Sequence, residues 1–354
     1  MFNTQIRNVM FDLAQNREIF DETQGRAISK AEANEAIKRV VFEDLGLSAT
    51  SSPKEIRRAF AKDSALAFFE TIEEIIDAQI SYGLDNNSFF NTLVDTRNIK
   101  DGDANEFWAE DDILLNVAKA AGNHHDLITQ TIGIGASYTI PTYYYSVKVG
   151  NDLKLFLTGK RDWNQFVDAV AKAFINKFQT EFASQLVNGV NMVAAPSVLT
   201  GTGALSASTK TEFDEIIEKI ESANEAPVAI YGTKTALKNL NALASASSVD
   251  WIPESQKEAL AVTGIMGYYE GSTLIAIPQK FTDKTLATPI VPANKLFVMP
   301  LVDGNKPIKF VDYGESEFTQ TEVGDTKDDM QTYEVQRRAG VGTIMTRYHG
   351  VWTI

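Results

Sequence analysis

The clearest hydrophobic pattern in the chain lies between residues 161 and 187. Large apolar side chains recur there every three or four residues, which is the spacing of one face of an α-helix. These side chains are Trp163, Phe166, Val167, Val170, Phe174, Phe178, Phe182 and Leu186. Asp162 is the predicted N-cap and Gly189 the predicted stop. A helix over 161–187 would be ~40 Å long, and its one-sided apolar stripe predicts that it packs against another layer.

The segment before this helix, TYYYSVKVGNDLKLFL at residues 142–157, alternates with a period of two. It predicts two short strands joined by a turn at residues 150–152. Tyr144 and Phe156 face away from the other large side chains of their strands, so both faces of the ribbon are apolar. Because an isolated two-stranded ribbon is marginal in water, we expect one face to pack on its own domain and the other on a second chain. The predicted contacts between subunits are Tyr143, Tyr144, Tyr145, Val147, Leu155 and Phe156.

The N-terminal part of the chain predicts separate helices on polar connectors. Capping boxes at Ser29–Glu32 and Ser52–Glu55 mark two helix starts, and Gly83 marks a stop. Residues 95–112 are acidic and rich in turn formers, and a short helix is predicted over about 111–121. We therefore expect an ordered helical arm without a dense core of its own.

Helical and strand patterns alternate in the second half of the chain. Helices are predicted over 210–222 and about 253–261, and a short one over TKTALKNLNALAS. The segments PVAIYG, GSTLIAIP, KLFVMPL and KPIKFVDYG predict strands, and Asp303-Gly304 is a hairpin turn signal between the last two. The C-terminal segment QTYEVQRRAGVGTIMTRYHGVWTI predicts two strands, kinked at Gly340 and Gly342.

Composition narrows the class of protein. Of the 354 residues, 44% are hydrophobic and 23% charged, which is typical of a globular protein. The absence of cysteine excludes disulfides, cysteine-based zinc sites and thiol nucleophiles. No apolar run reaches the roughly 18 residues that cross a bilayer, so we expect no membrane partner. The net charge of −14 argues against a sequence-specific nucleic-acid binder, which normally has a basic face.

No arrangement of chemically active residues indicates catalysis. His124 and His125 are adjacent, His349 is isolated, and none has the spacing of a zinc site. The acidic stretch 101–112 lacks the glycine that a calcium loop needs at its sixth position, where Glu106 stands. Phosphate loops, dinucleotide fingerprints and nucleophile elbows are missing from the sequence. We therefore predict no catalytic residue, no cofactor and no metal site, and leave an incidental cation in the acidic stretch open.

Two segments carry a resemblance to a known family. PVAIYGTKTALKNL and YEVQRRAGVGTIMTRYHGVWTI, together with the order of ribbon, long helix and α/β segment, resemble major capsid proteins of tailed bacteriophages of the Hong Kong 97 type. The resemblance implies an α+β fold with an N-terminal helical arm, an extended E-loop hairpin, a spine helix, and peripheral and axial domains. The implied boundaries are 1–126 for the arm, 127–160 for the E-loop, 161–225 for the peripheral domain with the spine helix, 226–305 for the axial domain and 306–354 for the return strands of the peripheral domain.

The resemblance also implies a function. It implies a structural protein, not an enzyme, whose hexamers and pentamers form an icosahedral shell around double-stranded DNA, in a virion assembled in the host cytoplasm. Portal, scaffold and decoration proteins are implied partners, and the acidic charge predicts that DNA is held without tight specific binding. Two alternatives stay open: an encapsulin-type bacterial compartment, distinguished by an enzyme cargo, and a cytosolic α/β enzyme, distinguished by small size in solution.

Overall fold

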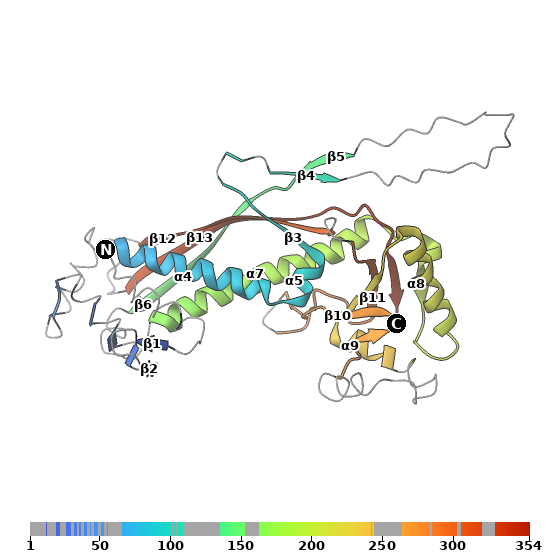
Figure 1. Cartoon of the computed structure of the whole chain (residues 1–354), viewed down its shortest axis with the longest axis horizontal. Helices are drawn as coiled ribbons and strands as arrows, with labels where there is room; N and C mark the ends of the chain where they lie inside the picture. Colours follow the sequence, from blue (N-terminus) through green and yellow to red (C-terminus); the bar gives the residue numbers. More distant parts are fainter. Residues whose placement is uncertain are drawn as a thin grey trace.

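The computed structural model describes most of the chain from residue 66 onward. The described residues are 66–100, 102–103, 105–109, 135–152, 163–241, 243, 264–282, 285–302, 306–320 and 330–354, with short stretches between 12 and 55. The predicted helices over 111–121 and 253–261, the predicted cap Asp162, and the predicted contacts Leu155 and Phe156 lie outside them. The predicted α+β class is confirmed, because two mixed layers of helices and strands make up the described part (Figure 1).

A four-stranded sheet runs along the long axis of the molecule. Its strands are β3 (Val94–Asn98), β12 (Ile308–Gln320), β13 (Met330–Thr343) and β6 (Tyr143–Asp152), in that spatial order. β3 runs parallel to β12, and the other two pairs are antiparallel. Within the described residues, β3 and β6 are therefore the two edges of this sheet.

Two helices cover one face of this sheet. They are α4 (Leu66–Asp85), which lies against β12, and α7 (Trp163–Met192), which lies against β13 (Figure 1). The predicted apolar stripe of the long helix is confirmed, since its members from Phe166 to Leu186 are buried. The ring of Phe310 on β12 lies 5.2 Å from the rings of both Phe178 and Phe182. This aromatic cluster holds α7 on the sheet.

The long helix does not stop where the sequence predicts. α7 continues through Gly189 to Met192, so its 30 residues span ~45 Å. A Cβ atom at Gly189 would lie 2.5 Å from Cγ2 of Thr343 on β13. The glycine therefore permits the helix to approach the sheet closely, and its role is packing, not termination.

A buried arginine joins α4 to the sheet. The Arg337 side chain is 1% exposed, and its guanidinium donates to Asp312 through Nε to Oδ1 at 3.0 Å and Nη2 to Oδ2 at 2.6 Å. Nη1 pairs with Asp77 of α4 and donates to Ser316 Oγ at 3.2 Å. The β12–β13 register is irregular between Asp312 and Ser316, so both residues lie beside Arg337. Burial raises the pKa of Asp77, although Arg337 lowers it in part.

A second, six-stranded sheet lies at the other end of the molecule (Figure 1). Its spatial order is β7 (Thr200–Thr202), β14 (Gly350–Thr353), β11 (Lys295–Pro300), β8 (Val228–Gly232), β10 (Ser272–Ala276) and β9 (Tyr268–Tyr269). The predicted strand PVAIYG is confirmed as β8, which is buried throughout. Helices α8 (Lys210–Asn224) and α9 (Lys234–Lys238) confirm the patterns predicted around them.

One predicted strand connection is wrong. β11 pairs with β8 and β14, whereas β12 pairs with β3 and β13, so the two strands flanking Asp303-Gly304 belong to different sheets and form no hairpin. The C-terminal segment forms the two predicted strands, β13 and β14, and Gly340 and Gly342 both lie within β13. A Cβ atom at Gly340 would lie 2.6 Å from the carbonyl oxygen of Pro141, so this glycine allows another backbone to approach.

The remaining elements are short. They are β1 (Ile19–Asp21), β2 (Arg26–Ile28), α5 (Ser88–Leu93), β4 (Glu106–Ala109), β5 (Ala136–Thr139) and the 3₁₀-helix η2 (Ser197–Leu199). Both predicted capping boxes are confirmed, because Glu32 and Glu55 each accept a backbone N–H bond at 2.8 Å from the serine three residues before. The expectation of a purely helical segment before residue 126 is wrong, because β1 to β4 lie within it.

Candidate subunit interface

β6 is one strand, and its predicted turn is wrong. Residues 150–152 continue the strand and pair with residues 330–332 of β13. A long partner strand supplies regular pairing here, so the local Gly-Asn-Asp turn signal does not determine the structure. The segment predicted as a ribbon, residues 142–157, is therefore part of the four-stranded sheet over Tyr143–Asp152.

The inner face of β6 packs on the core of its own chain. Tyr145, Val147 and Val149 lie against the apolar cluster that α7 and the sheet share. The Tyr145 ring lies 5.2 Å from that of Phe178, in an edge-to-face arrangement. Burial raises the pKa of the Tyr145 hydroxyl, and the nearby Glu181 adds to the effect. Tyr145 and Val147, two of the predicted contact residues, are thus already partly covered within one subunit.

Tyr143 and Tyr144, the other two described contact residues, are exposed. The side chain of Tyr143 is 61% exposed and that of Tyr144 is 67% exposed. Tyr144 is next to the inward-facing Tyr145, and side chains alternate along a strand, so Tyr144 lies on the outer sheet face, which α4 and α7 do not cover. Arg338 on β13 is its cross-strand partner on that face. Tyr143 points to the opposite, inner face, so each face of the strand carries one exposed tyrosine, a residue type common at protein contacts.

A recess lies on this outer sheet face beside Tyr144. The guanidinium of Arg338 is 4.2 Å from the ring centre of Tyr313 and 5.8 Å from that of Tyr144, and its Nε donates to Thr142 Oγ1 at 3.3 Å. The recess has a volume of about 290 Å³ and is lined by Lys100, Tyr144, Tyr313, Glu315, Glu317, Gln336 and Arg338. Tyrosine and arginine are the residue types that most often carry binding energy at interfaces.

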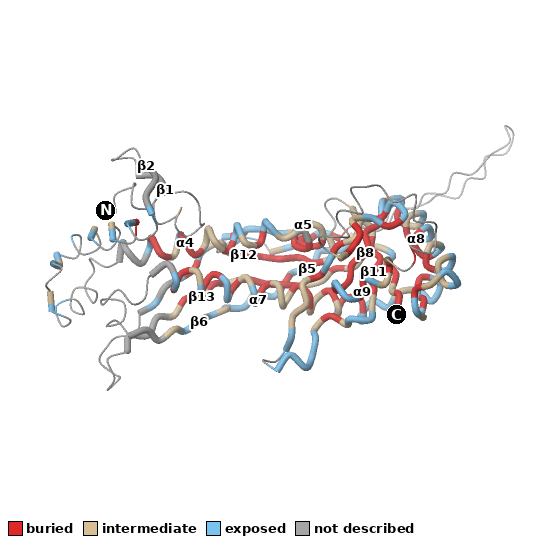
Figure 2. Tube along the Cα trace, turned by 90° about the horizontal axis from the view of Figure 1, so that it is seen from below, coloured by how far each residue is buried: buried red, intermediate tan, exposed pale blue. Residues whose placement is uncertain are grey.

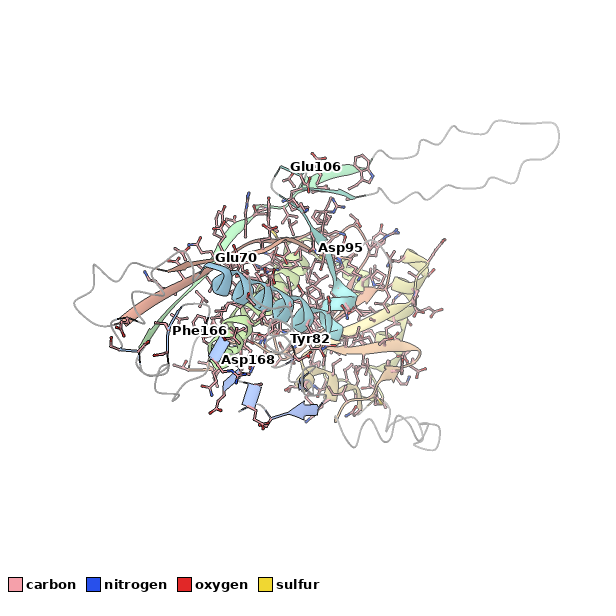
Figure 3. The ribbon with its side chains drawn as sticks, turned by 60° about the vertical axis from the view of Figure 1, so that its left-hand side comes forward. Glu70, Tyr82, Asp95, Glu106, Phe166 and Asp168 are labelled. Atoms are coloured by element: carbon pink, nitrogen blue, oxygen red, sulfur yellow. The ribbon has the colours of Figure 1, made fainter. Side chains whose placement is uncertain are left out.

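A projecting hairpin provides the second exposed aromatic surface. β4 and β5 pair antiparallel, and Figure 3 shows the hairpin, with Glu106 on it, standing away from α7, the helix that carries Phe166 and Asp168. At its base, Phe107 is buried beneath the guanidinium of Arg97, which lies 4.5 Å from the ring centre. Asn105 Nδ2 donates to the carbonyl oxygen of Ile140 at 2.5 Å, which ties the two sides of the hairpin together.

The hairpin presents two large aromatic side chains to solvent. Trp108 is 59% exposed and Tyr138 is 48% exposed. The prediction from sequence assigned no contact role to either residue, because β4 lies in a stretch classified as turn-rich. In the sequence Glu106–Ala109 the apolar residues Trp108 and Ala109 stand next to each other, so the segment does not alternate and gives no strand signal for β4.

The described residues contain no arrangement that points to catalysis or metal binding. No group of three or more histidine, aspartate or glutamate side chains within them could hold a metal ion. His349 is buried near the junction of the two sheets, and burial lowers its pKa. No helix in the described part is long and apolar enough to cross a membrane.

The chain belongs to the family described as "SPbeta prophage-derived putative capsid protein YonB", whose model matches residues 5–353. The prediction of a phage capsid protein is thereby confirmed. Among curated proteins, none matches the chain.

Solved structures of shell proteins are similar to the chain at low identity. They include a virus-like particle from Pyrococcus furiosus (10% identity, 78% of this chain, 97% of that chain, TM-score 0.40). The capsid of cyanophage P-SCSP1u matches with 12% identity over 75% of this chain and 87% of that chain, with a TM-score of 0.49. The holo-SrpI encapsulin complex from Synechococcus elongatus PCC 7942 matches with 9% identity over 75% and 86%, with a TM-score of 0.41. The family assignment rests on the family model, which spans nearly the whole chain.

Proposed function

We propose that copies of this capsid protein assemble, as hexamers and pentamers, into an icosahedral shell around double-stranded DNA. Membership of the capsid family carries the proposal. The exposed aromatic side chains on β6 and on the projecting hairpin support it, because a lone subunit leaves them in water. The role is structural and not enzymatic: many modest contacts, repeated by symmetry, stabilise the closed particle.

The parts of the subunit take different roles in this proposal. The four-stranded sheet with α7 corresponds to the peripheral domain and its spine helix, and the six-stranded sheet corresponds to the axial domain. The β4–β5 hairpin takes the role of the extended loop that lies on a neighbour; its second strand, β5, falls within the range 127–160 predicted for that loop. Trp108 and Tyr138 on the hairpin, and Tyr143 and Tyr144 on β6, are the proposed contact residues.

The charge of the chain supports a loose relation to the packaged genome. A net charge of −14 repels phosphate, so DNA is retained by enclosure and counterions without tight specific binding. We place assembly in the host cytoplasm, with a portal and with scaffold or decoration proteins as further partners.

Electron microscopy of the expressed chain tests the proposal. The wild-type chain forms closed particles, and Trp108→Ser combined with Tyr144→Ser reduces particle yield at least tenfold while the subunit keeps its circular dichroism spectrum. Tyr82→Ser is the matched control, because Tyr82 is an equally exposed aromatic side chain on the outside of α4, remote from the hairpin (Figure 3). Normal particles from the double variant would overturn the contact assignment. Particles that contain enzymes instead of DNA would favour a bacterial compartment.

A further inference from the structure

β6 is a long sheet edge that carries few of the usual protections against pairing. It runs for 10 residues, ~33 Å, and its register with β13 is continuous from one end to the other. Among the described residues no strand pairs with its other side, and Figure 2 shows β6 along the margin of the body. Proteins normally guard such edges with proline, bulges, several charges or short length. Between Tyr143 and Val149 the strand has no proline, no bulge and one charged residue, Lys148.

The length of this edge limits which described strand could pair with it. Every other strand with a free side in the described part is shorter: β3 has 5 residues, β4 and β5 have 4 each, β1, β2 and β7 have 3 each, and β9 has 2. β12 and β13 are long, but each already has a neighbour on both sides. A second copy of β6 is thus the one described strand that matches the full length of the edge.

We propose that β6 pairs antiparallel with β6 of a second copy across a twofold axis at Ser146. This inference rests on the proposed function, because a closed icosahedral shell supplies the twofold axes that such a self-complementary contact needs. The two four-stranded sheets then form one continuous eight-stranded sheet. The axis passes through Ser146 itself and not between two residues. Residues directly opposite each other in an antiparallel pair point to the same side of the sheet, so this position places outward-facing residues of one copy opposite outward-facing residues of the other.

Side-chain chemistry selects Ser146 as the centre. In this register Tyr145 lies opposite Val147 of the second copy, and Tyr143 opposite its Val149, so the inner apolar row continues from one subunit into the next. On the outer face Lys148 lies opposite Tyr144, where an ammonium group and an aromatic ring attract each other. The register therefore covers Tyr143 and Tyr144, which a single subunit leaves largely exposed.

The absence of cysteine makes the contact directly measurable. Ser146→Cys introduces one thiol per chain, and in the proposed register the two thiols face each other, with Cβ atoms about 4.5–5.5 Å apart. Lys148→Cys is the matched control on the same strand and face, because its two copies are about 13 Å apart along the strands. Both side chains are exposed, so neither change disturbs the core.

Assembled particles of each variant are treated with a short bifunctional thiol reagent and separated on a denaturing gel. We expect most chains of Ser146→Cys to run as covalent dimers, and less than a tenth of those of Lys148→Cys. Particles that form normally but show no dimer at position 146, or equal dimer at both positions, overturn the pairing and leave the proposed function intact. A wild-type chain that makes no particles overturns the proposed function instead.

A charge substitution provides a second readout. Ser146→Lys places two ammonium groups face to face at the axis, so we expect at least a tenfold loss of particles. Co-expression with Ser146→Glu converts the repulsion into attraction, and we expect particles to return. Full assembly of Ser146→Lys by itself would contradict the pairing, provided that circular dichroism shows both variants folded.

Discussion

Replacing Arg337 by methionine tests how α4 is held on the sheet. The change keeps a long apolar stem but removes the guanidinium that pairs with Asp77 and Asp312. Those carboxylates are 22% and 8% exposed, so neither can recover its hydration without local opening. Breaking a buried ion pair by removing one partner costs about 3–5 kcal/mol. Since domains are stable by only about 5–15 kcal/mol, this loss is a large part of the total.

The neighbouring arginine provides the matched control. Arg338 points to the outer face and rests on the rings of Tyr313 and Tyr144. Its replacement by methionine removes cation–π contacts worth about 0.5–1 kcal/mol each at exposed sites. We therefore expect Arg337→Met to lower the free energy of unfolding at least twice as much as Arg338→Met.

The assay is urea unfolding of dilute, unassembled subunits, followed by tryptophan fluorescence. Adding Asp77→Asn and Asp312→Asn to Arg337→Met removes the stranded charges, so we expect part of the lost stability to return. The reasoning is refuted if the two single arginine variants unfold at the same urea concentration, or if the asparagine substitutions lower the stability of Arg337→Met further.

Two further predictions concern the sheet junction and the base of the hairpin. Burial holds the pKa of His349 below its ordinary value of about 6.5, so the folded state disfavours the protonated ring. The stability that the neutral ring contributes is present above pH 6.5 and is lost as pH falls below it. His349→Gln therefore flattens the fall in unfolding midpoint between pH 7.5 and 5, and an unchanged pH profile would contradict this. Gly340→Ala places a Cβ atom 2.6 Å from the carbonyl oxygen of Pro141, so we expect a loss of about 1–3 kcal/mol in urea unfolding. Gly267→Ala, where a Cβ atom meets nothing within 4 Å, is its control, and equal midpoints would exclude the close approach.

Elements set by local periodicity were predictable from the sequence. The stripe from Phe166 to Leu186 predicted the long helix, because burial on one side of a helix repeats every three or four residues. PVAIYGTKTALKNL predicted β8 from its continuous apolar run, and α9 after it. The alternation at Tyr143–Val149 likewise predicted a strand. The order of these elements carried the family resemblance.

Features that depend on partners distant in sequence were not predictable. Arg337 lies 25 positions from Asp312 and 260 from Asp77, so no local spacing predicts their cluster. The two strands of the projecting hairpin each have 4 residues and meet across a long connection, so Trp108 had no strand signal of sufficient length. The Gly-Asn-Asp turn signal in β6 was overridden by β13, which pairs with those residues. Contacts between subunits remain predictions.

The central claim is that this chain completes its structure by assembling with many copies of itself. Electron microscopy of the purified wild-type chain, at the concentration at which it is expressed, tests that claim most directly. We expect closed particles of uniform size, tens of nanometres across. A homogeneous, stable monomer under the same conditions, with Trp108 and Tyr144 no more exposed to solvent quenchers than buried aromatic residues, would contradict it.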